Sequence, residues 1–332
     1  MGKNGKFRVL IVGSGQIGTR HLQAVASLPQ LSEVEIVDPH PAAVRLGKER
    51  LSEISDCQTS TTFRWLSSLE KATVGGDLCI VATQADVRCQ VVCRVAETLG
   101  YSNFLLEKVV SQSVHEYESL IEFTHVKGLS VWVNCKSRAY PFHQRAQGYL
   151  NPSEPVQFSV LGSNHGLATN GVHAADLFLA YDGANQIHSS GSIIDPILHP
   201  SKRGEGIFDL SGTLHGYTEK GSHFMVSYSS DNHSQEHTTI MTPRYRCIVD
   251  QMRHWAYESD SDNGWAWRPA IFDDNLLISQ MTKAFATDIL TMGRCELPTL
   301  EECFPAHKFI LSELLPHFNK LLDVKGDRCP VT

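Results

Sequence analysis

The sequence contains no long hydrophobic run, no long basic run and no C-x-x-C motif. A membrane helix needs about 20 apolar residues, so we expect no membrane-spanning segment. The formal net charge is −7, which argues against a nucleic-acid surface as the main function. The nine cysteines are an odd number and lie mostly in apolar segments. We therefore expect reduced thiols in a cytoplasmic protein, with no disulfide framework.

The chain has 332 residues, of which 42% are hydrophobic and 20% charged. This length and composition predict a globular protein with two domains. The first residues, MGKNGK, lead directly into an apolar segment, so we expect no signal peptide.

The segment from Phe7 to Asp38 contains the strongest local pattern. Phe7–Val12 is a short apolar run typical of a strand buried on both faces. A glycine-rich turn of the form G-x-G-x-x-G follows, then a helical stretch over about 16–27 and a second apolar strand at Val34–Val37. Asp38 ends this second strand. The order strand, glycine turn, helix, strand, acidic residue is typical of a dinucleotide-binding unit.

Each glycine of the turn has an expected role. The first permits the tight turn out of the strand, the second leaves room for a pyrophosphate, and the third lets the helix lie close to the sheet. The carboxylate of Asp38 would bind the adenosine ribose and repel a 2′-phosphate, which predicts NAD(H) in preference to NADP(H). The alternative is a glycine turn that binds nothing. The predicted cofactor residues here are Gly13, Ser14, Gly15, Gln16, Ile17, Gly18 and Asp38.

Helical and strand-like segments alternate through the rest of the first half. We expect helices at 41–52, 61–71, 86–100 and 113–126, and strands at 57–60, 77–83, 103–107 and 129–135. This order predicts right-handed βαβ units and a Rossmann-type, doubly wound parallel sheet. Ligands bind at the carboxyl ends of such strands. Thr83, Gln84, Glu107 and Lys108 are expected there.

After about residue 135 the pattern changes. We expect helices at 140–150, 171–181, 273–292 and 300–322, and strands at 156–161, 207–218, 222–228, 238–241 and 245–249. The alternating segments predict an α+β domain with a largely antiparallel open sheet. The chain is thus α/β overall, with domains at 1–135 and 136–332. The C-terminal helices could instead pack back on the first domain.

Several short motifs resemble those of the glucose–fructose oxidoreductase, inositol dehydrogenase and rhizopine-catabolism (Gfo/Idh/MocA) family. They are Thr19-Arg20-His21 after the glycine-rich turn, Ala82-Thr83, Glu107-Lys108, the segment 134–141, NGVHAAD at 170–176 and LPTLEE at 297–302. The resemblance implies an NAD(P)-dependent oxidoreductase acting on a sugar or cyclitol. It also implies a nicotinamide between the Rossmann domain and an open sheet, and a homo-oligomer, dimer or tetramer, formed through that sheet.

The chain departs from the family pattern at several positions. In the family a proline follows this lysine, and the bond between the two is often cis. Val109 takes the place of that proline here. Gln84-Ala85 replaces Pro-Asn, Arg88 replaces a frequent histidine, and Thr169 replaces a frequent aspartate. The frame for hydride transfer is kept, whereas the polar contacts around it differ.

The resemblance makes Lys108 and His173 the candidate catalytic residues. A lysine at a buried strand end can bind a substrate hydroxyl or stabilise an alkoxide. A histidine titrates near neutral pH and suits a general acid or base. The alternatives are a salt-bridged lysine and a core histidine.

The candidate substrate residues are Arg138, Thr169, Asn170 and Asp176. Thr169 and Asn170 could orient the substrate or cap a helix. Asp176 lies three residues beyond His173, so it could hold that ring or be a structural carboxylate. Lys136, Arg244 and Arg246 could bind an anionic substrate group but are more typical of surface charges.

The segment 233–237, HSQEH, fits a zinc protease pattern that requires a helix. Turn residues before it and a strand-like segment after it favour a hairpin, so we expect no zinc hydrolase and assign no metal ligand. Positions 233 and 237 would share a face of that hairpin, which leaves metal binding as the alternative.

The sequence therefore predicts an NAD(P)-dependent dehydrogenase or reductase acting on CH–OH groups of carbohydrate-like small molecules. The alternatives are a non-catalytic NAD(H)-binding sensor or assembly protein and an enzyme that retains its cofactor without net redox.

Overall fold

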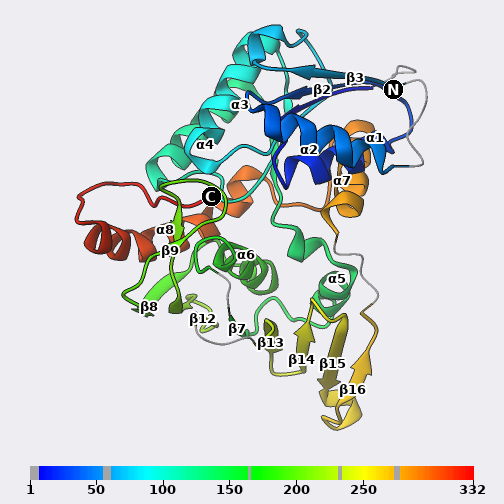
Figure 1. Cartoon of the computed structure of the whole chain (residues 1–332). Coiled ribbons are helices and arrows are strands. Elements are labelled where there is room, and N and C mark those ends of the chain that lie inside the picture. The colour runs from blue at the N-terminus through cyan, green and yellow to red at the C-terminus, as the bar shows by residue number, and fades with distance from the viewer. Residues whose placement is uncertain (1–6, 55–60, 164–165, 231–233, 273–276) are drawn as a thin grey trace. The chain divides into compact units, whose positions relative to one another are not determined.

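The computed structural model describes all residues except 1–6, 55–60, 164–165, 231–233 and 273–276. The chain divides into two compact units (Figure 1). The first comprises residues 1–111, 116–134 and 275–300, and the second comprises residues 112–115, 135–274 and 301–332.

The first unit is built on a parallel sheet of six strands in the order β3-β2-β1-β4-β5-β6. The strands are β1 (Phe7–Val12), β2 (Leu31–Val37), β3 (Thr62–Leu66), β4 (Leu78–Val81), β5 (Asn103–Leu106) and β6 (Ser130–Val133). The strand order reverses at β1 and β4, whose carboxyl ends therefore flank the switch point where ligands bind in doubly wound sheets. The predicted Rossmann-type sheet is confirmed.

Helices connect these strands and cover the sheet. They are α1 (Gly18–Ala26), α2 (Pro41–Ser52), α3 (Ala85–Leu99), α4 (Val114–Lys127) and α7 (Ile278–Met292), with a 3₁₀ turn η1 (Leu69–Lys71). Figure 1 shows α1, α2 and α7 grouped together, and α7 packs along α1. Helix α3 ends at Leu99, and Gly100 directly after it adopts a left-handed conformation with φ of 71°. This is the expected C′ position for glycine.

The predicted helix over 61–71 is wrong. Residues 62–66 form β3, which pairs in parallel with β2, and only Leu69–Lys71 makes a 3₁₀ turn. The alternation of Phe63 and Trp65 with Arg64 suits a strand, because aromatic residues favour the pleated surface. Trp65 packs against Gly47 of α2, where a Cβ would lie 2.6 Å from the indole. The strand predicted at 57–60 lies outside the described residues.

The second unit contains a mixed sheet of eight strands in the order β16-β15-β14-β13-β7-β12-β11-β8. Only β7 and β12 pair in parallel among these strands, so the largely antiparallel prediction is confirmed. The strands are β7 (Gln157–Ser163), β8 (His188–Ile194), β11 (Gly212–Tyr217), β12 (His223–Ser229), β13 (His237–Met241), β14 (Tyr245–Asp250), β15 (Trp255–Asp260) and β16 (Arg268–Ala270). A separate pair joins β9 (His199–Pro200) to β10 (Phe208–Asp209).

Helix α6 (Gly171–Asp182) covers one face of this sheet. Phe178 of α6 packs against Phe158 of β7 and Phe224 of β12, with ring centroids 5.8 and 5.3 Å apart. The other elements of the unit are α5 (Pro141–Gln147), α8 (Leu300–Leu322) and the 3₁₀ turns η2 (Lys136–Ala139) and η3 (Ser261–Asn263). Among the described residues, no helix is long and apolar enough to cross a membrane.

Candidate cofactor and active site

The glycine-rich turn after β1 has the geometry that its sequence predicts. Gly13 has φ of 95°, and a Cβ there would lie 2.8 Å from the backbone of Ala82. A Cβ at Gly18 would lie 1.9 Å from the carbonyl oxygen of Gly13. A Cβ at Gly15 would meet nothing within 4 Å. Two glycines thus permit the fold itself, whereas Gly15 borders open space at the start of α1.

Asp38 follows β2 and faces the same turn. Its Oδ2 accepts hydrogen bonds from the Ser14 N–H at 2.7 Å and the Ser14 hydroxyl at 3.3 Å. Its Oδ1 accepts a hydrogen bond from the His40 N–H at 2.9 Å. Each carboxylate oxygen can accept more than one hydrogen bond, so a ribose hydroxyl could bind in addition.

Arg50 of α2 contacts Gln16, an exposed residue of the glycine-rich turn. Its guanidinium donates to the carbonyl oxygen of Gln16 at 2.7 Å and also bonds the Gln16 side chain. Burial lowers the pKa of Arg50, and the charge of Arg20 lowers it further. No local sequence pattern marks Arg50 as a partner of the turn, because it lies 34 residues beyond Gln16.

The turn after β4 carries Thr83 and Gln84. The Thr83 hydroxyl oxygen is buried and has no hydrogen-bond partner among the residues that the structure describes. Gln84 is the N-cap residue of α3. The buried guanidinium of Arg88 donates to the carbonyl oxygens of Thr83 and Val109. Arg88 therefore ties the end of β4 to the segment after β5.

Glu107 and Lys108 follow β5 and are both buried, with 7% of each residue exposed. The Glu107 Oε1 lies 2.9 Å from His21 Nε2 and accepts a hydrogen bond from Asn134 at 2.6 Å. His21 Nδ1 lies 2.9 Å from the Thr282 hydroxyl of α7. Burial opposes ionisation of Glu107, but the contacts with His21 and Asn134 outweigh it and lower the pKa to about 2.

His21 of α1 and Asn134, directly after β6, hold Glu107, and Thr282 of α7 holds His21 in turn. The network so fixes the backbone from which Lys108 extends. The peptide bond between Lys108 and Val109 is cis. His21 and Asn134 belong to motifs that marked the family resemblance, although the sequence suggested no partner for either.

In the second unit, His173 lies in the first turn of α6. The turn before this helix is held by Asp209 of β10, which accepts hydrogen bonds from the N–H groups of Ala168 at 2.9 Å and Thr169 at 3.1 Å. The Thr169 hydroxyl also donates to Asp209. Asn170 is the N-cap residue of α6. No sequence pattern indicates Asp209 as the partner of this turn, because it is 40 residues from Thr169.

Arg138 and Asp176 form an ion pair. The Arg138 guanidinium donates to both carboxylate oxygens of Asp176, at 2.9 and 2.6 Å. Asp176 is fully buried, and burial raises its pKa to about 6 against the lowering effect of Arg138. This ion pair is consistent with Asp176 being a structural carboxylate, one of the two roles that the sequence allowed.

The remaining basic candidates contact other groups of the second unit. The Lys136 ammonium lies 5.7 Å from the Tyr140 ring centroid, and Arg244 lies 3.3 Å from Glu154. Arg246 stacks over Trp267 at 4.6 Å.

His237, the second histidine of the HSQEH segment, begins strand β13, whereas His233 lies outside the described residues. At His237 the chain is therefore a strand, where the zinc protease pattern requires a helix.

The structure thus assembles the predicted residues in two groups. The fingerprint glycines, Asp38, Thr83, Gln84, Glu107 and Lys108 belong to the first unit, and His173, Thr169, Asn170, Arg138 and Asp176 belong to the second. The first group fits a dinucleotide, because it offers an open space at Gly15, a buried hydroxyl at Thr83 and a carboxylate after β2. The class of protein that this fold and turn define is a dinucleotide-binding Rossmann protein.

Residues 7–135 match the model of the Gfo/Idh/MocA family, described as an oxidoreductase family with an NAD-binding Rossmann fold. This match over the first unit's sheet confirms the family resemblance seen in the motifs of the sequence. No curated protein sequence matches the chain.

Solved structures share the fold over nearly the whole chain at low identity. An oxidoreductase from Agrobacterium radiobacter, in complex with NAD⁺, L-tartaric acid and magnesium, is 12% identical with a TM-score of 0.74, covering 95% of this chain and 97% of its own. The UDP-N-acetylglucosamine 3-dehydrogenase GnnA from Acidithiobacillus ferrooxidans is 15% identical with a TM-score of 0.70, covering 93% and 97%. A 3-ketoreductase from Actinomadura kijaniata, in complex with TDP-benzene and NADP, is 15% identical with a TM-score of 0.70, covering 92% and 96%.

Proposed function

We propose that this protein is an NAD(H)-preferring oxidoreductase that transfers hydride between nicotinamide and a secondary alcohol or ketone. The substrate class is a sugar, sugar acid, nucleotide sugar or cyclitol. The observation that carries this proposal is the buried Glu107-Lys108 pair at the end of β5, beside the switch point of the dinucleotide-binding sheet. Such a switch point is where the cofactor lies in doubly wound folds.

The bound cofactor supplies or accepts the hydride, and the protein must orient the reacting carbon and manage one proton. The Lys108 ammonium donates a hydrogen bond to the reacting oxygen and so stabilises the alkoxide formed as a proton leaves. His173 accepts that proton during oxidation and returns it during reduction. Asp209 holds Thr169 and the turn before α6, and thereby positions the His173 backbone. Thr169 and Asn170 contact the substrate.

A carbohydrate-like substrate is supported by two structural neighbours, a UDP-N-acetylglucosamine 3-dehydrogenase and a 3-ketoreductase. Because each is only 15% identical to this chain, the particular substrate has to be found by screening. A panel of sugars, sugar acids, cyclitols and nucleotide sugars, followed by the absorbance of reduced nicotinamide, would identify a substrate.

The cofactor preference rests on Asp38, whose carboxylate would repel a 2′-phosphate. We expect NADH to raise the thermal midpoint more than NADPH at equal concentration, since a ligand that binds only the folded state stabilises it. The variant Asp38→Ser should reduce the difference. Equal or greater stabilisation of the wild type by NADPH would overturn the preference and direct attention to His40 and Arg45, which follow Asp38 closely.

The catalytic roles predict separate effects on turnover and on cofactor affinity. Lys108→Met removes the charge but keeps much of the side-chain bulk, and His173→Ala removes the proton-transfer group. Each should lower turnover by about 10²–10⁴-fold, the usual contribution of a positioned acid or base. NADH affinity should change by only a few-fold, because neither residue lies in the glycine turn.

Lys127→Met is the matched control, because it removes an exposed lysine of the same unit. It should leave turnover unchanged. Turnover equal to that of the wild type in both catalytic variants would contradict the assignment. Tight NADH binding by a wild type that turns over no compound would instead favour the sensor, and slow exchange of a bound cofactor during turnover would indicate an enzyme that retains it.

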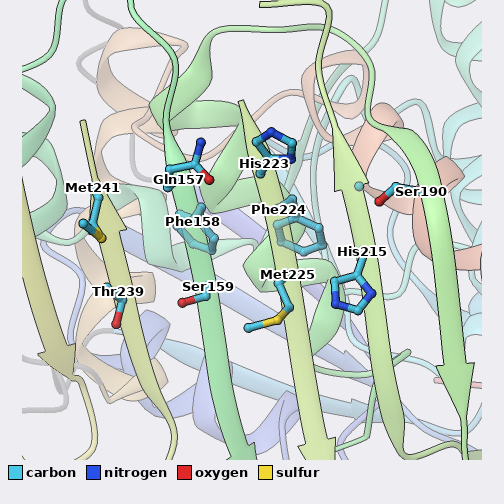
Figure 2. A pocket seen from close by; sticks show the side chains of 11 residues that line it. Gln157, Phe158, Ser159, Ser190, His215, His223, Phe224, Met225, Thr239 and Met241 are labelled. Carbon is cyan, nitrogen blue, oxygen red and sulfur yellow. The ribbon is translucent and has the colours of Figure 1, made fainter. Parts of the chain in front are cut away.

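A homo-oligomer formed through the open sheet is also proposed. The residues that alternate with the buried ones on β7, β11, β12 and β13 point away from α6, and Figure 2 shows several of them lining a pocket. Large apolar side chains are exposed on this outer face at Leu161, Ile193, Tyr217, Met241, Trp255 and Tyr257. A second copy of the chain could bury these apolar side chains, as interaction sites do with exposed apolar surface.

A further inference from the structure

Three buried side chains of the second unit cluster without a role in the proposed reaction. They are Cys135, Asp176 and Cys303, and their ligand atoms all lie within 4.8 Å of one another. The two Sγ atoms are 3.4 Å apart. Each of the three residues is fully buried, with no measurable exposure.

The three residues come from separate parts of the chain. Cys135 directly precedes η2, Asp176 lies in the middle of α6, and Cys303 lies in the first turn of α8. No short spacing motif connects them, so the sequence alone did not indicate the cluster. Two of the three ligands lie on helices, which hold side chains more rigidly than loops do.

Two thiolates and a carboxylate suit Zn²⁺ best among common divalent ions. Zinc takes cysteine sulfur at about 2.3 Å and carboxylate oxygen at about 2.0–2.2 Å, whereas Mg²⁺ and Ca²⁺ prefer oxygen ligands. Tetrahedral coordination with that bond length places two sulfurs about 3.8 Å apart. The Sγ atoms at 3.4 Å therefore need to separate only slightly.

Neighbouring groups already orient two of the ligands. Arg138 donates to both oxygens of Asp176, and each oxygen keeps a further lone pair for a metal. His307 Nδ1 lies 3.5 Å from the Cys303 sulfur and 3.0 Å from the Cys303 carbonyl oxygen. Such contacts around the ligands are typical of metal sites and tune their affinity.

The charges of the cluster also balance. Without a metal, the Arg138 cation offsets the Asp176 anion, and the two thiols are neutral. Binding of Zn²⁺ with loss of both thiol protons leaves the total charge unchanged. This matters because an uncompensated charge in a buried site is very costly.

We propose that Cys135, Asp176 and Cys303 form a zinc site that holds η2, α6 and α8 of the second unit together. The three ligands leave the fourth position for a water molecule. The zinc site is separate from the proposed oxidoreductase function, so a test of metal binding does not depend on whether the protein transfers hydride. Because the ligands are fully buried, the metal enters during folding.

The test uses the full chain, kept reduced throughout with a phosphine. The protein is expressed with zinc in the medium and its metal content measured, and it is then stripped in denaturant and refolded with Co²⁺. We expect about one metal per chain and the near-ultraviolet absorption of cobalt–thiolate bonds. Cys135→Ser and Cys303→Ala keep the Arg138–Asp176 pair, and each should weaken metal binding by about 100-fold or more, since loss of surrounding contacts alone costs 10–100-fold.

Cys247→Ala is the matched control, because Cys247 is a buried thiol of β14 outside the cluster. It should bind metal as the wild type does. The proposal is overturned if the wild type shows no cobalt–thiolate absorption, or if Cys303→Ala binds metal as tightly as the control. The wild-type spectrum decides the question even if a cysteine variant fails to fold.

Discussion

Individual residues in the glycine turn serve different physical purposes. Gly13 and Gly18 are required by the backbone, because a Cβ at either would contact backbone atoms at 2.8 Å or less. Gly15 is not required in this way, since its Cβ would meet nothing within 4 Å. The open space at Gly15 is where we propose that the pyrophosphate of the cofactor lies.

This difference leads to a pair of substitutions with opposite effects. Gly15→Val should abolish NADH binding while the thermal midpoint stays within a few degrees of the wild type, because the side chain enters only the pyrophosphate space. Gly18→Val should lower the midpoint itself, because its Cβ meets the Gly13 carbonyl. The measurements are thermal unfolding and an NADH fluorescence titration. Native NADH affinity in Gly15→Val would mean that the dinucleotide lies elsewhere.

A second residue-scale effect concerns His143 of α5. The side chain is fully buried, its Nδ1 lies 2.9 Å from the Tyr181 hydroxyl, and its Nε2 lies 3.0 Å from the Gln251 amide nitrogen. Burial lowers the pKa of His143 to about 3. An unfolded histidine has a pKa of about 6.5, so between these values the unfolded chain binds a proton that the folded chain does not. Stability should therefore fall as the pH decreases from about 6.5 towards 3.

His143→Gln tests this linkage, because glutamine can keep hydrogen bonds but does not titrate. The free energy of unfolding of the wild type should lose up to about 1.4 kcal/mol per pH unit through this histidine, and the variant should lack that contribution. Urea unfolding at several pH values between 4 and 7 would measure the slopes. His125→Gln, at an exposed position of α4, is the control. Equal slopes in wild type and His143→Gln would contradict the expectation.

At the scale of elements, the available pairing partner determined whether some segments form a helix or a strand, which their local sequence pattern did not. Residues 61–71 have a composition compatible with a short helix, yet β2 offered an unpaired edge and Trp65 fits over Gly47. β15 and β16 were not predicted at all, and they extend the second sheet by pairing with β14 and each other. Long apolar or amphipathic segments such as α2, α3 and α8 were predicted closely, because their periodicity is local.

At the scale of the whole molecule, the outer face of the eight-stranded sheet supports the proposed assembly. We expect the wild type to be a dimer or tetramer, and Leu161→Lys with Met225→Lys to dissociate it, because two charges would be buried at the interface. Both residues point away from α6, on the neighbouring strands β7 and β12. Light scattering after size exclusion would measure the mass.

Val126→Lys, at an exposed apolar position of α4 with 78% exposure, is the control for charge alone. It should leave the mass unchanged. A monomeric wild type at micromolar concentration, or an unchanged assembly in the double variant, would exclude this face as the interface.

The sequence by itself determined the strand–turn–helix unit, the acidic residue after β2 and the change from parallel to antiparallel architecture. These features depend on short-range patterns, namely glycine spacing, periodicity and strand composition. Only the tertiary structure decided that His21 and Asn134 hold Glu107, that Asp209 holds the turn before α6, and that Cys135, Asp176 and Cys303 meet. Those contacts join residues far apart in the chain, and polar side chains find such partners because burial makes an unpaired polar group costly, a condition that exists only once the chain is folded.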